Sequence, residues 1–274
     1  PVINHEIDAV TDSAMADVIE KTLSIQSIYD FVNTLDRNKD DLHMVEQAIL
    51  VNRRIAQEGA DKKFGLHIGQ NIAAARRAGI MGSDVVTVAM EMTACGIDAR
   101  MGGANLPVVT NSGSGNQGIT ATIPVVTAAE LLGFDEDRMF RAVTLSHLMA
   151  IYIHCRFGLL SALCGATIAG TGASCGLVYL LGGNSEQIGY AVNNMIGCVT
   201  GMLCDGAKAD CAMKVGACVN TAFLSAFMAL DNISVRPKEG IVESEPAQTI
   251  RNFVRLGNDG SPVMDNIMLD IMLK

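Results

Sequence analysis

Hydrophobic residues recur with a helical period through most of the chain. Between His43 and Glu58 they return every three or four positions, and Gly59 offers a stop. Alternating runs of β-branched residues, which are typical of strands, are nearly absent. The same period predicts further helices over residues 14–23, 25–35, 64–78, 84–97, 135–156, 161–181, 185–202, 212–230 and 245–256. The sequence therefore predicts an all-α fold.

The chain shows no sign of a domain boundary. No internal repeat and no linker rich in Pro, Gly or Ser divides its 274 residues. A hydrophobic content of 49% with 18% charged residues is enough to build a sizeable core. We therefore expect one compact multi-helix domain over residues 1–274, with glycine-rich loops at 101–118 and 201–210, where the helical pattern breaks.

A long stretch with almost no charge raises the alternative of a membrane protein. From Phe157 to Cys204 the only charged residue is Glu186, and this length would allow two spans. The stretch is built largely from small and polar residues, contains no Trp, and lacks the flanking Lys and Arg clusters that fix orientation in a bilayer. We therefore expect a tightly packed core beside a site, and no membrane partner.

The net charge and the cysteine content indicate which partners and which compartment to expect. The formal net charge is −9 and no run of Lys and Arg occurs, so we expect no nucleic-acid partner. The eight cysteines indicate thiols or metal ligands of a cytoplasmic protein, because a reducing cytosol does not sustain disulfides. Seven of the eight lie between Cys155 and Cys218.

Residues 113–118 fit the dinucleotide-binding pattern G-x-G-x-x-G and follow a strand-like segment at 108–110. That fold also needs a second strand ending in an acidic residue, whereas Asp135 reads as a helix cap and Pro124 lies inside the preceding helix. A polar loop that holds a small carboxylate at a helix N-terminus fits better, although a plain glycine-rich turn stays open. The candidate substrate-binding residues are Ser112, Gly113, Ser114, Gly115, Asn116 and Gln117.

Cys164, Cys204 and Cys211 lie in two segments of small residues, 161–170 and 201–211. Their spacing matches neither the C-x-x-C knuckle of structural zinc sites nor the consecutive run of ferredoxins. From spacing alone, a metal site and a set of small buried hydrophobic residues both remain open.

Three motifs together resemble the family of L-cysteine desulfidases and iron-sulfur L-serine dehydratase alpha chains. They are Ser-Gly-Ser-Gly-Asn-Gln-Gly at 112–118, Ser-Ala-Leu-Cys-Gly-Ala at 161–166, and Gly-Met-Leu-Cys-Asp-Gly-Ala-Lys at 201–208 followed by Cys211. The resemblance implies a [4Fe-4S] cluster held by Cys164, Cys204 and Cys211, with a fourth iron that has no protein ligand.

The resemblance also implies a lyase. It would remove the β-substituent of a small amino acid, a reaction that needs a base for the Cα proton and a Lewis acid for the leaving group. We expect L-cysteine to give pyruvate, ammonia and sulfide, because the short spacing between Cys204 and Cys211 resembles the desulfidase branch. L-serine deamination and a non-catalytic cluster-binding module are the alternatives, and the all-α pattern argues against a pyridoxal-phosphate enzyme.

The base of this family is a cysteine in a Gly-Cys-Thr-Glu-Pro motif that does not occur in this sequence. We therefore expect it in a missing N-terminal segment of the same enzyme, with an inactive homologue as the alternative. Lys208 either binds the substrate carboxylate or offsets cluster charge, with a solvated loop lysine as the alternative. His147 and His154 share one helix face, and satisfied core histidines are favoured over site residues. A homodimer is a further expectation.

Overall fold

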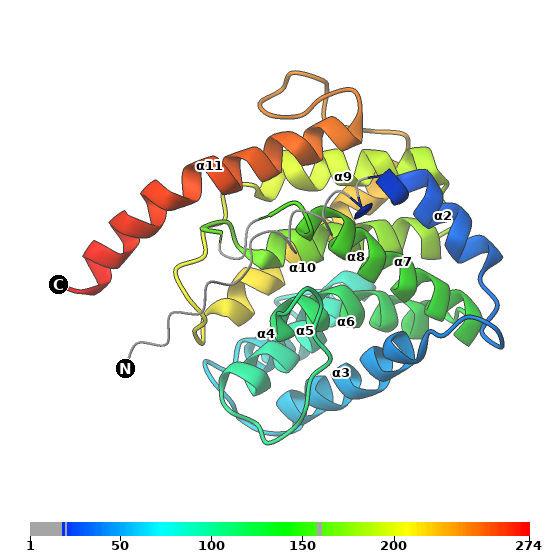
Figure 1. The fold of residues 1–274 in the computed structure, drawn as a ribbon. Coiled ribbons are helices and arrows are strands. Elements are labelled where there is room, and N and C mark those ends of the chain that lie inside the picture. The colour runs from blue at the N-terminus through cyan, green and yellow to red at the C-terminus, as the bar shows by residue number, and fades with distance from the viewer. Residues whose placement is uncertain (1–17, 20, 158–160) are drawn as a thin grey trace.

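The computed structural model describes residues 18–19, 21–157 and 161–274, and within these ranges all regular secondary structure is helical. The predicted all-α fold is thereby confirmed (Figure 1). The helices are α2 (Ile25–Thr34), α3 (His43–Asp61), α4 (Ile68–Arg77), α5 (Val85–Met101), α6 (Gly115–Leu132), α7 (Glu136–His154), α8 (Gly165–Leu180), α9 (Ser185–Val199), α10 (Cys211–Leu230) and α11 (Pro246–Met272). The predicted helix over 14–23 falls largely outside the described residues.

Several predicted helices have different bounds in the structure, and two of these differences have identifiable reasons. The helix expected from residue 64 begins at Ile68, because Gly65 and His67 adopt left-handed φ angles of 55° and 58° that a helix cannot contain. The last helix runs sixteen residues past its predicted end at 256, to Met272. Gly257 does not stop it, since this glycine serves close packing: a Cβ there would meet Cε1 of Phe157 at 2.3 Å.

Helix α8 forms the centre of the core. Every residue of α8 after Gly165 is buried. Its glycines let neighbouring helices approach closely, as at Gly172, where a Cβ would meet the Ser146 carbonyl oxygen of α7 at 2.4 Å. The long stretch with little charge is thus the helix on which the others pack.

Helices α5, α6, α8 and α10 form a four-helix group in which α5 contacts α6 and α10, and α8 contacts the same two. Helices α8 and α10 run parallel, because Gly170 packs on Cys218 and the Ser174 hydroxyl donates to the Ala222 carbonyl. Helices α6 and α8 also run parallel, as the contact between Gly176 and Val125 near their C-terminal halves indicates.

Helix α5 runs in the opposite direction to α6, because Gly96 packs on Ile119 while Arg100, near the end of α5, packs on Gly115 at the start of α6. The N-termini of α6, α8 and α10 and the C-terminus of α5 therefore meet at one end of the core. Three helix N-termini together give that end a locally positive backbone potential.

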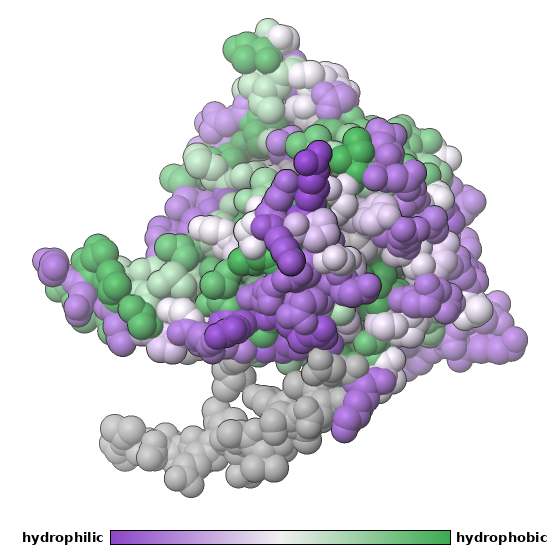
Figure 2. Space-filling model, turned by 90° about the horizontal axis from the view of Figure 1, so that it is seen from above, coloured by the Kyte–Doolittle hydropathy of each residue, from purple (hydrophilic) through white to green (hydrophobic). Residues whose placement is uncertain are grey.

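Helix α11 lies beside α9 and continues past the rest of the molecule to the C-terminus (Figure 1). Hydrophobic side chains gather on this projecting end (Figure 2), among them Ile267, Ile271 and Leu273. By length and composition, α10 is the one described helix that could cross a membrane. It packs against α5, α8 and α9, and core helices share its composition.

Candidate active site

The glycine-rich loop enters α6 through a tight turn. Asn111 and Ser114 exchange two backbone hydrogen bonds of 3.1 and 3.0 Å around Ser112 and Gly113, whose φ angles are 48° and 79°. This is the geometry of a type I′ turn, in which both central residues have positive φ. The Ser114 hydroxyl then accepts from the Gln117 N–H and caps α6.

The strand-like segment at 108–110 is not part of a strand. Both main-chain groups of Val109 bond instead to the side-chain amide of Asn52, which accepts from the N–H at 2.9 Å and donates to the carbonyl at 3.1 Å. Asn52 is fully buried on α3. A single amide thus replaces the partner strand that a dinucleotide-binding unit would need.

A buried network of polar side chains holds the turn at residues 111–114 in place. Asn111 Nδ2 lies 3.2 Å from the His147 carbonyl oxygen and 3.1 Å from Nδ1 of the same residue. Since a carbonyl only accepts, Nδ2 is the donor, Nδ1 of His147 accepts, and Nε2 carries the proton toward Thr122 Oγ1 at 2.9 Å. Burial lowers the pKa of His147 to about 4, so the ring is neutral at physiological pH.

His147 is therefore a satisfied core histidine, as favoured from the sequence, and it reaches the loop only through Asn111. His154 lies at the end of α7 with its ring centroid 6.4 Å from that of Phe157. Burial lowers the pKa of His154 as well.

Gln117 connects the glycine-rich loop to the cysteine segment. Its side chain is 5% exposed and lies directly on Gly165, where a Cβ would meet Gln117 Nε2 at 2.7 Å. Gly165 follows Cys164, so two motifs that are 47 residues apart meet at the starts of α6 and α8. Within the described ranges, Gln117 Oε1 is buried and has no hydrogen-bond partner.

Cys164 and Cys204 are brought together by a short antiparallel pairing. Leu163 and Leu203 form an isolated bridge, the Cys164 N–H donates to the Met202 carbonyl at 2.9 Å, and the Cys204 N–H donates to the Ala162 carbonyl at 2.7 Å. The two thiols lie close enough to shift each other's pKa. Helix α11 supports the pairing, because Ser261 Oγ accepts from the Ala162 N–H at 2.7 Å.

The contact between the thiols separates their pKa values. The neighbouring Cys164 thiol lowers the pKa of Cys204 to about 6, assisted by the Gly206 N–H and Lys214 against the effect of burial. The Cys204 thiol and burial raise the pKa of Cys164. These contacts favour the thiolate form of Cys204, and the thiolate is the form of cysteine that binds metal.

Cys211 is the first residue of α10, and its sulfur accepts from the Lys208 N–H at 3.5 Å. The Lys208 side chain is exposed and its ammonium pairs with Asp205 and Asp210. Lys214, one turn into α10, donates to the Leu203 carbonyl at 2.9 Å and to Asp205 at 2.7 Å.

Both lysines hold the pKa of Asp205 well below its usual range through their hydrogen bonds. Sequence reasoning singled out Lys208 and missed Lys214, although its position three residues after Cys211 places it one helical turn away.

The cysteines suit an iron-sulfur cluster in donor type, since thiolates are its usual ligands. Cys164 and Cys204 are in contact, and Cys211 begins the helix that follows the Cys204 loop. Among the described residues, no three His, Cys, Asp or Glu side chains converge as they would around one metal ion. A cluster differs from a single ion in that each cysteine binds a different iron, so its ligands need not meet at a point.

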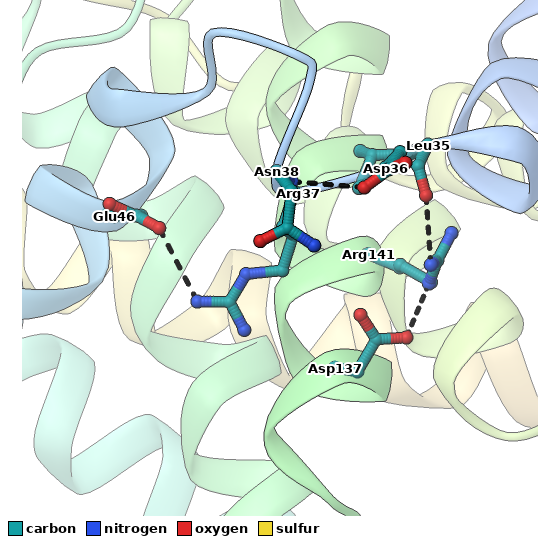
Figure 3. Close-up of a pocket in the computed structure, with 7 residues that line it drawn as sticks. All are labelled: Leu35, Asp36, Arg37, Asn38, Glu46, Asp137 and Arg141. Carbon is teal, nitrogen blue, oxygen red and sulfur yellow. Dashed lines mark hydrogen bonds and ion pairs between the residues drawn. The ribbon is translucent and has the colours of Figure 1, made fainter.

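The structure also contains a cleft that includes none of the predicted site residues. It has a volume of about 670 Å³ and lies between the α2–α3 loop and the start of α7 (Figure 3). With 19 residues, α7 places this cleft about 28 Å from the α7 terminus nearest the cysteines. Its charges pair with one another: Arg37 with Glu46 at 3.4 Å, and Arg141 with Asp137 at 2.6 Å.

Arg100 is a further residue of the site that the sequence did not single out. It is half-buried near the end of α5, and a Cβ at Gly115 would come within 2.3 Å of its Nε. Its Nη1 donates to Asn116 Oδ1 at 2.9 Å. The guanidinium thus lies on the first turn of α6.

Several proteins are similar to the chain over nearly all of its length. A UPF0597 protein of Oleidesulfovibrio alaskensis is 44% identical over 265 residues, which are 96% of this chain and 61% of that protein. UPF0597 proteins of Vibrio campbellii and Porphyromonas gingivalis are 46% and 42% identical, over 91% and 98% of the chain and 58% and 62% of their own lengths. The chain thus spans about 60% of the length of these relatives. No solved structure matches it.

The family model described as the serine dehydratase alpha chain matches residues 9–270. This range includes the glycine-rich loop, Cys164, Cys204 and Cys211, which come together at one end of the core. The chain belongs to the serine dehydratase alpha chain family.

Proposed function

We propose that this chain is the cluster-binding part of an iron-sulfur lyase that converts L-cysteine to pyruvate, ammonia and sulfide. The observation that carries the proposal is the contact between Gln117 and Gly165, which joins the glycine-rich loop to Cys164. Membership of the serine dehydratase alpha chain family supports lyase chemistry on a small amino acid.

In this proposal, Cys164, Cys204 and Cys211 hold a [4Fe-4S] cluster. When bound, the cluster supplies a Lewis acid for the leaving group. The Gly206 N–H and the Lys214 ammonium favour the thiolate form of Cys204. The ion pairs of Asp205 with Lys208 and Lys214 hold the segment between Cys204 and Cys211. Lys208 is thereby a residue of the cluster loop.

The glycine-rich loop binds the amino-acid part of the substrate. Within residues 112–117, Ser114 and Gln117 already donate their N–H groups inside the loop, and the N–H groups of Ser112, Gly113, Gly115 and Asn116 are left for a carboxylate. Gln117 Oε1 is a buried acceptor without a donor, and the α-ammonium group of the substrate supplies one. His147 fixes the turn through Asn111 and is not the base, because both of its ring nitrogens are engaged.

The base lies outside this chain in our proposal. The family's base cysteine belongs to a Gly-Cys-Thr-Glu-Pro motif that this sequence lacks. We therefore assign it to an N-terminal segment of the full-length protein. L-serine is the second candidate substrate, since the matching family is described by serine dehydration.

Iron loading tests the cluster assignment. The chain is purified without oxygen and reconstituted with iron and sulfide, and iron content and visible absorbance are measured for the wild type and for Cys164→Ala, Cys204→Ala and Cys211→Ala. Cys198→Ala is the matched control, because Cys198 is an exposed thiol on α9. We expect the wild type and the control to bind equal amounts of iron and each of the three variants to lose most of it.

A wild type without iron, or three variants that load like the control, would contradict the cluster assignment. L-cysteine and L-serine are then added to the loaded wild type, and the change in absorbance is titrated. Cluster binding without any response to either amino acid would favour the non-catalytic module.

A further inference from the structure

The guanidinium of Arg100 lacks an anionic partner. Its Nη1 donates hydrogen bonds to Asn116 Oδ1 at 2.9 Å and to the Met101 sulfur at 3.3 Å. Across the described residues, no carboxylate lies within ion-pair distance of Arg100, and neither Nε nor Nη2 has an acceptor. Arg100 is partly exposed and its Nε and Nη2 are not sealed from solvent, so both nitrogens are accessible to a ligand.

Two other half-buried arginines are neutralised by carboxylates, while Arg138 donates to the Leu180 carbonyl and lies over the Tyr179 ring. Arg76 makes a bidentate pair with Glu91 at 2.8 and 3.2 Å. Arg141 pairs with Asp137 at 2.6 Å and donates to main-chain carbonyls at the end of α2. Arg100 therefore differs from the arginines that tie helices together.

The surroundings of Arg100 point to a ligand that carries a carboxylate. The guanidinium lies on Gly115, where only the absence of a Cβ makes room for it, so the charge is held at the N-terminus of α6. Gln117, two residues further on, is 95% buried, since its exposed fraction is 5%, and its Oε1 has no donor within the described ranges. Gln117 faces Gly165 of α8, whereas the guanidinium faces Gly115, so the free fork of Arg100 is the group here that complements a carboxylate.

We propose that Arg100 binds the α-carboxylate of the amino-acid substrate through Nε and Nη2. The proposal rests on the proposed function and names a binding residue outside the three motifs. Asn116 acts as a positioning residue, because its side chain accepts from Nη1 and so directs the two remaining nitrogens of the fork.

The test measures the dissociation constants of L-alanine and L-alaninamide on the anaerobic, cluster-loaded protein by calorimetry. L-alanine carries both charged groups but no leaving group, and L-alaninamide lacks the carboxylate. The proteins are the wild type, Arg100→Gln, Arg100→Lys and the control Arg77→Gln, which removes an exposed charge at the end of α4.

We expect Arg100→Gln to weaken L-alanine binding about 10- to 100-fold, the usual effect of losing a charge-assisted hydrogen-bond pair. Binding of L-alaninamide should stay within about 2-fold, and Arg100→Lys should fall between wild type and Arg100→Gln. Arg77→Gln should match the wild type for both ligands.

Equal weakening of both ligands in Arg100→Gln would overturn the carboxylate assignment and leave the proposed function intact, because it would indicate a structural role. The same conclusion follows if the wild type binds L-alanine and L-alaninamide equally well. If the loaded wild type responds to neither L-alanine, L-cysteine nor L-serine, the proposed function fails, and the role of Arg100 fails with it.

Discussion

Acidification should destabilise this chain through His147. Burial lowers the pKa of this histidine from 6.5 to about 4. Below pH 6.5 the unfolded chain therefore binds a proton at His147 that the folded chain does not bind. The free energy of unfolding then decreases as the pH falls toward 4. With these two values, a change from about pH 7.5 to about pH 4.5 removes about 2.5 kcal/mol from the free energy of unfolding.

Urea unfolding at both pH values measures this loss. The variant His147→Gln removes the titrating group, and His154→Gln is the matched control because His154 lies on the same helix but outside the Asn111 and Thr122 network. At neutral pH, His147→Gln should be less stable by about 1–3 kcal/mol, since buried partners lose their hydrogen bonds. Its further loss on acidification should be smaller than that of the wild type by about 2.5 kcal/mol.

The difference between the two proteins isolates His147, because all other titrating groups contribute to both. His154→Gln should keep most of the pH dependence of the wild type. If His147→Gln and the wild type lose the same free energy between the two pH values, the ring is not held neutral and the reasoning from its buried network is wrong.

Three further substitutions, one of them a control, test by urea unfolding which contacts hold the loops in place. Gly118→Ala should destabilise by at least about 3 kcal/mol, because its Cβ would lie 1.9 Å from the Val109 carbonyl oxygen, whereas Gly216→Ala meets nothing within 4 Å and should stabilise by about 0.5–1 kcal/mol. A similar cost at both glycines would refute the close approach at Val109. Ser261→Ala should cost about 1–3 kcal/mol by leaving the Ala162 N–H without an acceptor, and a cost below about 0.5 kcal/mol would mean that α11 does not hold this segment.

The helices were predictable because their signals are local. The periodic apolar residues of α3 and the carboxylate cap of Asp84 on α5 act within a few positions of the elements that they define. The length of α11 was not predictable, because Gly257 resembles a stop until its contact with Phe157 is known. The strand-like segment at 108–110 was misleading for a similar reason, since its partner is the side chain of Asn52 from another helix.

Some residues of the candidate site were likewise predictable from the sequence, and others were not. The motifs containing Gln117 and Cys164 were visible in the sequence, and the structure places them in contact through Gly165. Lys214 and Arg100 carry no motif, and their roles depend on partners that only the fold supplies: Asp205 for the lysine, and the first turn of α6 for the arginine. Isolated charged residues on helices are usually solvated, so pattern alone gives no reason to select them.

The meeting of four helix ends at the candidate site ties its integrity to the whole core. No single loop carries the site, so a slide of α6, α8 or α10 along its neighbour would separate the glycine-rich turn from the cysteines. The site therefore cannot persist after these helices part. During thermal or chemical denaturation, loss of tertiary packing between them should always be accompanied by loss of ligand binding.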